Sequence, residues 1–240
     1  MVKLCGREFA SVEKKAIEQS ILADSDKEKL SFGELFKGKI GKVVLLGTLL
    51  AAFQQITGIN AVVNYAPIIF QKTGVGGDTA LLQSMLVGLV NFLATIVALW
   101  LVDTKGRKTL LLWGGAGMTL ALAYLTYAFA FDGAPMAILI SLLAYIASFA
   151  ASFAPVMWVV TSEMFPNRIR SMALSFSTAV SWLFAFVTVQ FSPYILNNFG
   201  GSVLFGFFGF FTVLALFFVQ IWIPETKGKA LEQIEKELGL

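Results

Sequence analysis

The chain has 240 residues, of which 57% are hydrophobic and only 14% are charged. A soluble domain carries about a quarter charged residues, so this composition excludes an ordinary soluble domain. One cysteine and no histidine exclude a disulfide framework and remove the commonest metal ligand and general base. We therefore expect no metal, no cofactor and no enzyme, with a membrane enzyme kept as a distant alternative.

Residues 1–42 are expected to form a cytoplasmic linker. Apolar residues recur at helical spacing between 9 and 21, which predicts a short amphipathic helix. Residues 31–34 have the spacing of a capping box and predict a second short helix. The alternative for the first helix is that it is surrounded by solvent and packs against no other surface. No apolar core of a signal peptide occurs in the first thirty residues.

Long apolar stretches fill the rest of the chain. A helix needs about 20 apolar residues to cross the hydrocarbon core of a bilayer. Six stretches are long enough: about 43–71, 80–102, 109–131, 136–162, 171–196 and 202–223. The sequence therefore predicts an all-α membrane protein, with a six-helix transmembrane bundle over 43–223 and a cytoplasmic tail over 224–240.

The positive charges predict the orientation of the bundle. Of the 18 lysines and arginines, 17 fall in residues 1–42, 103–108, 163–170 and the tail, and only Lys72 falls on the other side. Positive loops stay inside, so we expect a multi-pass protein of the cell membrane with both ends in the cytoplasm. The net charge of +3 is then a topology signal, and the expected partner is the lipid bilayer, with no nucleic acid.

The first span is unusual. Residues 43–70 would make a helix about 42 Å long, which exceeds the hydrocarbon core. The span contains Gly58 and Pro67, and interrupted spans are a pointer to transporter binding sites. Its amides are Gln54, Gln55, Asn60 and Asn64. A break near Gly58 would turn Asn60 toward the cavity that Gln54 faces.

These amides have two interpretations, and spacing alone leaves both open. Each amide carries donors and acceptors, as sugar hydroxyls do, so together they suit a polyhydroxylated solute. Buried amides also join transmembrane helices through hydrogen bonds. Asn91, in the second span, has the same two interpretations.

Two tryptophans lie deeper in their spans than the others. Trp158 follows Pro155, and we expect these two residues to interrupt the fourth span; Trp182 lies in the fifth. An indole face packs against the C–H face of a pyranose ring while its N–H donates a hydrogen bond. The alternative for each is packing or membership of the interfacial aromatic belt.

Acidic residues are absent from the middle of every predicted span, so the chain offers no proton relay of its own. Asp103 and Glu163 lie at cytoplasmic span ends beside Arg107 and Arg168. Ion pairs among these four would hold a cytoplasmic gate closed. The alternative is solvated loop charge, where exposed pairs contribute about 0–1 kcal/mol.

Four motifs occur in a fixed order, at residues 54–70, 103–108, 155–170 and 224–235. Together they resemble the second half of the sugar porters of the major facilitator superfamily, spans seven to twelve. That family comprises proton–sugar symporters and facilitative hexose or pentose carriers. The resemblance implies one half of a major facilitator fold.

The resemblance also implies roles for residues. The implied sugar ligands are Gln54, Gln55, Asn60, Asn91 and Trp158, and we add Trp182. Asn64 and Tyr65 match positions that close an outer gate. The chain departs from the family at Ser181 and Ala185, where amides are frequent, so two polar contacts are weakened or missing.

Members of the family are about twice as long and consist of two six-helix halves. The titrating aspartate of the symporters lies in the first half. We therefore expect a C-terminal half that transports a monosaccharide together with an N-terminal half or a second copy of the chain. The alternative is a non-transporting half, or a truncated fragment, that binds sugar or acts as a regulator.

Overall fold

A computed structural model of the chain describes residues 32–71, 77–229 and 233–234. The chain divides into two compact units, Met1–Glu34 and Leu35–Leu240. Of the first unit only residues 32–34 are described, and they begin the 3-10 helix η1, Phe32–Phe36. The amphipathic helix expected between 9 and 21 lies outside the described residues.

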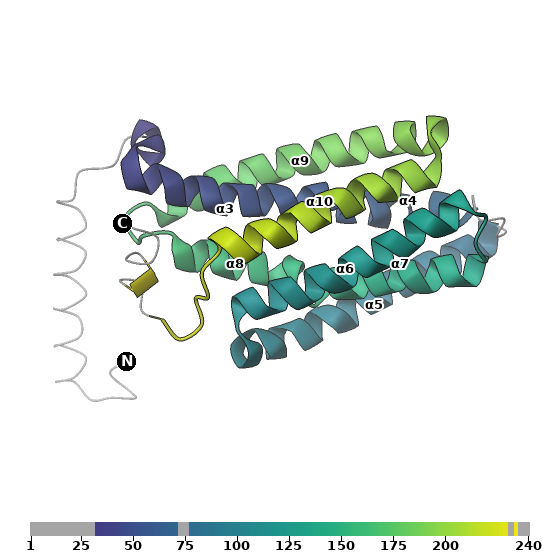
Figure 1. The fold of residues 1–240 in the computed structure, drawn as a ribbon, viewed down its shortest axis with the longest axis horizontal. Coiled ribbons are helices and arrows are strands. Elements are labelled where there is room, and N and C mark those ends of the chain that lie inside the picture. The colour runs from purple at the N-terminus through teal and green to yellow at the C-terminus, as the bar shows by residue number, and fades with distance from the viewer. Residues whose placement is uncertain (1–31, 72–76, 230–232, 235–240) are drawn as a thin grey trace, which may run out of the picture. The chain divides into compact units, whose positions relative to one another are not determined.

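The second unit consists of helices that lie side by side (Figure 1). These are α3 (Gly38–Ile56), α4 (Ile59–Gln71), α5 (Gly77–Lys105), α6 (Arg107–Ala130), α7 (Pro135–Ala150), α8 (Phe153–Met164), α9 (Arg170–Asn198) and α10 (Gly200–Trp222). Within the described residues they make six segments long and apolar enough to cross a membrane, with α3–α4 and α7–α8 each forming one segment. The prediction of six transmembrane helices is confirmed.

The first span lies at the centre of the unit. Helix α3 packs against α8, α9 and α10, whereas α6 pairs with α10 and α5 packs on α4 and α7. In the most apolar 18-residue stretch of the first span 61% is buried, compared with 17% in that of the second span. The starts of α3, α6 and α9 and the ends of α8 and α10 gather at one end of the bundle (Figure 1). We call this the charged end; its key residues are Arg107, Glu163 and Glu225.

The first span is broken between α3 and α4, as the sequence predicted. Gly58 has φ +94, a conformation that side-chain-bearing residues rarely adopt. A Cβ at this position would also lie 2.4 Å from the ring of Phe208. The backbone therefore turns at residues 57–58 because glycine alone fits there.

The fourth span breaks at residues 151–152, one turn before the position expected from the sequence. Proline has no N–H and its ring crowds the carbonyl four residues earlier, so Pro155 removes the helical hydrogen bond to Ala151. Helix α8 then continues through both Pro155 and Trp158. The expectation that these two residues themselves interrupt the helix is therefore wrong, because a proline disrupts the turn that precedes it.

Candidate functional site

Three amides at the break in the first span form a continuous hydrogen-bonded chain, which we call the amide string: Gln54, Gln55 and Asn60. Asn60 Nδ2 donates to Gln55 Oε1 at 2.6 Å, across the break. Gln55 Nε2 lies 3.4 Å from Gln54 Oε1 and donates to Ser181 Oγ on α9 at 3.1 Å. The turn at Gly58 therefore brings Asn60 back to the residues that precede it.

Gln54 is the buried end of the amide string. Its side chain is 4% exposed, and its Nε2 donates to the carbonyl of Phe153 at 2.9 Å and lies 3.4 Å from that of Ala154. Both carbonyls belong to the first turn of α8. Interhelical bonding, the alternative that the sequence left open, is thus present at Gln54. Gln55 and Asn60 are only half-buried and lie nearer the surface of the bundle.

A cavity of about 240 Å³ lies at the exposed end of the amide string, between α4 and α9. It is lined by Asn60, Asn64, Trp182, Ala185, Phe186, Val189 and Gln190. The structure therefore brings together two predicted amides and one predicted tryptophan, which is 67% exposed. Gln190 was missed from the sequence. Its spacing of eight residues after Trp182 places it on the same side of α9 and is a signal that sequence reasoning can use.

A larger hollow of about 400 Å³ lies between α9 and α10, but its lining is almost wholly apolar. Its polar side chains are the hydroxyls of Thr188 and Ser192, and both donate to backbone carbonyls. This hollow presents no set of donors and acceptors to a polyhydroxylated solute. The smaller polar cavity is the candidate site.

Gln54 and Gln55, the inner members of the amide string, do not line this cavity, and three further predicted residues of the spans lie away from it. Asn91 on α5 and Trp158 on α8 are half-buried, and neither is among the described residues that line it. Tyr65 instead lines a narrow gap against Leu196 and Phe208. The adjacent residues Asn64 and Tyr65 therefore face different surroundings, because successive residues of a helix point about 100° apart.

At the charged end, Arg107 and Glu163 form an ion pair with a distance of 3.1 Å between guanidinium and carboxylate. The side chains are 14% and 30% exposed, and the Thr226 hydroxyl donates to the second carboxylate oxygen at 2.5 Å. The pair is therefore partly shielded from water. Arg168 is exposed and pairs with no acidic residue of the described part. The Asp103 side chain lies outside those that the structure describes.

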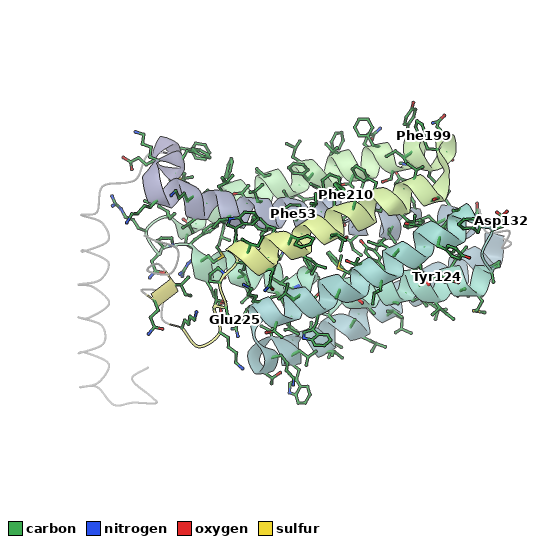
Figure 2. The ribbon with its side chains drawn as sticks, viewed as in Figure 1. Phe53, Tyr124, Asp132, Phe199, Phe210 and Glu225 are labelled. Carbon is green, nitrogen blue, oxygen red and sulfur yellow. The ribbon has the colours of Figure 1, made fainter. Side chains whose placement is uncertain are left out.

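Glu225 was missed as a structural residue, although the tail motif at 224–235 contains it. Its carboxylate accepts backbone N–H bonds from Arg107 at 2.9 Å and Lys108 at 3.1 Å, in the first turn of α6. It lies in the segment after α10, at the end of the bundle where α6 begins (Figure 2). An acidic group is favoured there because free N–H groups and the helix dipole point at it.

The same contacts set the acidity of Glu225. Partial burial raises the pKa of its carboxyl, but the backbone N–H groups of Lys227, Arg107, Lys108 and Thr109 outweigh burial and lower the pKa below its ordinary value. Gly106 makes the contact possible, because a Cβ there would lie 2.7 Å from a carboxylate oxygen of Glu225. This is a second position at which glycine is required by close approach.

The sequence matches known transporters along almost all of its length. The family described as "Sugar (and other) transporter" matches residues 2–238. The glucose facilitated diffusion protein of Zymomonas mobilis is 42% identical over 226 residues, which cover 91% of this chain and 47% of that protein. The D-xylose-proton symporter of Escherichia coli is 36% identical over 239 residues, or 97% of this chain and 48% of that protein.

The fold matches as well. The structure of the proton:xylose symporter XylE, of the major facilitator superfamily, superposes with a TM-score of 0.79 and 36% identity, covering 99% of this chain and 50% of that one. An inward-open structure of XylE from E. coli gives a TM-score of 0.77 at 34% identity. The prediction of one half of a major facilitator fold is confirmed, and the chain spans about half the length of the curated relatives it matches. The chain belongs to the sugar (and other) transporter family.

Proposed function

We propose that this chain is the C-terminal half of a monosaccharide carrier that works by alternating access, with the sugar held between this half and a second one. The observation that carries the proposal is the amide string at the break in the first span, which ends in a polar cavity between α4 and α9. Irregular backbone at membrane depth is tolerated where it lines a cavity. The relatives named as glucose and xylose transporters support the same substrate class.

The roles of the amides follow from their exposure. Gln55 and Asn60 offer donors and acceptors that exchange with sugar hydroxyls, and Gln54 holds them from behind through α8. Each exchanged hydrogen bond nets only about 0.5–1.5 kcal/mol, so affinity stays modest and the solute is released. Trp182 supplies an apolar face for the ring. Asn91 and Trp158 are proposed as further ligands on the other side of a sugar-occupied cavity.

The gates lie at opposite ends of the bundle. Asn64 and Tyr65, on α4, are proposed to close the outer side. The charged end, with the Arg107–Glu163 pair, is proposed to close the cytoplasmic side, with Asp103 and Arg168 nearby. The assignment of sides rests on the lysine and arginine counts, which predict that both chain ends lie in the cytoplasm of a cell-membrane protein.

We infer a second six-helix half because the chain spans only about half the length of the relatives it matches. That half is either an N-terminal half or a second copy of this chain related by a twofold axis along the membrane normal. Crosslinking in native membranes distinguishes a pair with another half, a homodimer and a monomer. A monomer that transports nothing favours the second candidate, a sugar-binding or regulatory half-transporter, since the chain spans only half of its relatives.

Transport is tested with the purified chain in liposomes, alone and together with a candidate second half. Uptake of labelled glucose and xylose is compared between the wild type and the double variant Gln54→Ala/Asn60→Ala. We expect the double variant to lose uptake. Asn198→Ala, at the exposed end of α9, is the matched control and retains it. Equal uptake by the wild type and the double variant would overturn the sugar-site assignment.

A further inference from the structure

The two helix breaks are joined to each other by a reciprocal pair of hydrogen bonds. Gln54, just before the break in the first span, donates to the Phe153 carbonyl at 2.9 Å, just after the break in the fourth span. Tyr145, on α7 and more than one turn before the break in the fourth span, donates from its hydroxyl to the Thr57 carbonyl at 2.8 Å, inside the break in the first. Each broken span therefore supplies a side chain to the backbone of the other.

The bond from Tyr145 supplies a donor to a backbone carbonyl at the break. Backbone carbonyls at the end of a helix have no intrahelical donor, and the bilayer core has no water to supply one. The Thr57 hydroxyl donates to the Gln54 carbonyl at 2.8 Å, and the Gly58 N–H donates to the Gln55 carbonyl at 3.0 Å. The Thr57 carbonyl receives its donor from Tyr145, which lies about ninety residues further along the chain.

We propose that Tyr145 and Gln54 form a clamp that makes the two breaks bend as one unit, and that Tyr145 is a positioning residue for the amide string. Tyr145 is fully buried on α7 and is not among the described residues that line the polar cavity, so the role proposed for it is indirect. Its hydroxyl fixes the backbone one residue before Gly58, where α4 changes direction. The direction of α4 in turn sets the 2.6 Å contact between Asn60 and Gln55.

The clamp couples α4 to α7 and α8 to α3 through its two hydrogen bonds. A tilt of α4 pulls on the Thr57 carbonyl and therefore on Tyr145 in the C-terminal half of α7. A tilt of α8 pulls on the Phe153 carbonyl and therefore on Gln54 at the end of α3. The existence of the clamp is independent of the proposed function, whereas its effect on sugar binding rests on it.

Hydrogen–deuterium exchange of the full chain tests the clamp without any sugar. Exchange is followed in peptides covering 57–63 and 151–158, the two breaks. Tyr145→Phe keeps the ring and removes only the hydroxyl, and Gln54→Met keeps the length of the side chain and removes the amide. Ser141→Ala is the control, since it removes a hydroxyl of the same helix that bonds only within α7.

We expect each of the two clamp variants to accelerate exchange about two- to tenfold at both breaks, the range that follows from the loss of one hydrogen bond. The control leaves both breaks unchanged. The clamp is overturned if acceleration is confined to the break that lost its own bond, or if neither variant accelerates exchange. Each variant removes a different hydrogen bond of the clamp, so if one variant misfolds, the other still tests the proposal.

Sugar binding tests the positioning role separately. If the wild type binds a monosaccharide, Tyr145→Phe is expected to weaken binding about two- to tenfold, whereas Ser141→Ala retains wild-type affinity. Unchanged affinity in Tyr145→Phe would overturn the positioning role. A wild type that binds no sugar would instead contradict the proposed function, and the exchange measurement would still decide on the clamp.

Discussion

The charged end and the amide string both join helices through polar side chains, but they use different chemistry. At the charged end, the Arg107–Glu163 ion pair connects α6 to α8, and the Glu225 carboxylate connects α6 to the segment after α10. The side chains of the ion pair remain 14% and 30% exposed. Inside the first span, neutral amides and hydroxyls connect α3 to α4, α8 and α9. A buried charge in a membrane is expensive, so the charged groups lie at the end of the bundle and the groups inside the span are neutral. Salt and pH should therefore affect the first region and leave the second unchanged.

The largest expected effect comes from breaking the turn on which the amide string depends. Gly58→Ala forces a Cβ into a positive-φ conformation and against Phe208, and we expect it to lower the free energy of unfolding by about 2–5 kcal/mol. Thermal unfolding in detergent measures the loss. Gly88→Ala is the control, because a Cβ there meets nothing within 4 Å. Equal stability of both variants would contradict the strained turn.

Removal of the ion pair at the charged end should have the next largest effect. Glu163→Gln removes the carboxylate charge that pairs with Arg107, and we expect a loss of about 1–3 kcal/mol at low salt, which is less than for a fully buried pair. The loss should shrink in 1 M salt, since ions screen a partly exposed pair. Arg168→Gln, at an exposed position, should cost nearly nothing. If the loss of unfolding free energy in Glu163→Gln does not depend on salt, the ion pair is more shielded from water than its exposed fractions indicate.

Acid should loosen the charged end through Glu225. The folded pKa of this carboxyl lies below its ordinary value of 4.5, so its contribution to stability is complete above about pH 4.5 and is lost as the pH falls through the folded pKa. Unfolding curves of the wild type and of Glu225→Gln should converge in acid and differ near neutrality. The effect should be smaller than that of Glu163→Gln, since the group is only partly buried. Parallel curves at every pH would contradict the role of the backbone N–H groups.

The smallest effect is expected at the edge of the amide string. Ser181→Ala removes one acceptor of Gln55, and we expect it to change stability by less than about 1 kcal/mol, with no dependence on salt or pH. Unfolding at two salt concentrations and two pH values measures this. If the stability change of Ser181→Ala depends markedly on salt, the contrast between the charged end and the amide string is contradicted.

Most of the fold could be predicted from the sequence. The six spans, the break at Gly58 and the charged loops follow from hydropathy, glycine placement and charge, which act locally along the chain. The break in the fourth span was placed one turn late, since a proline acts on the carbonyl four residues before it. The sequence also predicted that a break near Gly58 brings Asn60 toward Gln54 and Gln55, and the three amides do form one cluster.

The rest of the site depends on contacts between distant segments. Nothing local marks Tyr145 as the donor to Thr57, or Glu225 as the acceptor for the first turn of α6, because both partners lie about ninety residues or more away. Periodicity places Gln190 on the same side of α9 as Trp182, but it does not show that this side, or a given face of α4, meets a cavity. That is why Gln190 was missed, and why Asn64 and Tyr65 were paired although they face different surroundings.

The most direct test of the central claim is equilibrium binding of labelled D-glucose and D-xylose to the purified chain, alone and with a second half. The amide string should bind at least one of the two sugars, and Asn60→Ala should weaken binding about tenfold through its lost hydrogen bonds. Asn198→Ala should bind as the wild type does. Binding that is equal in the wild type and Asn60→Ala, or absent from the wild type under both conditions, would contradict the account.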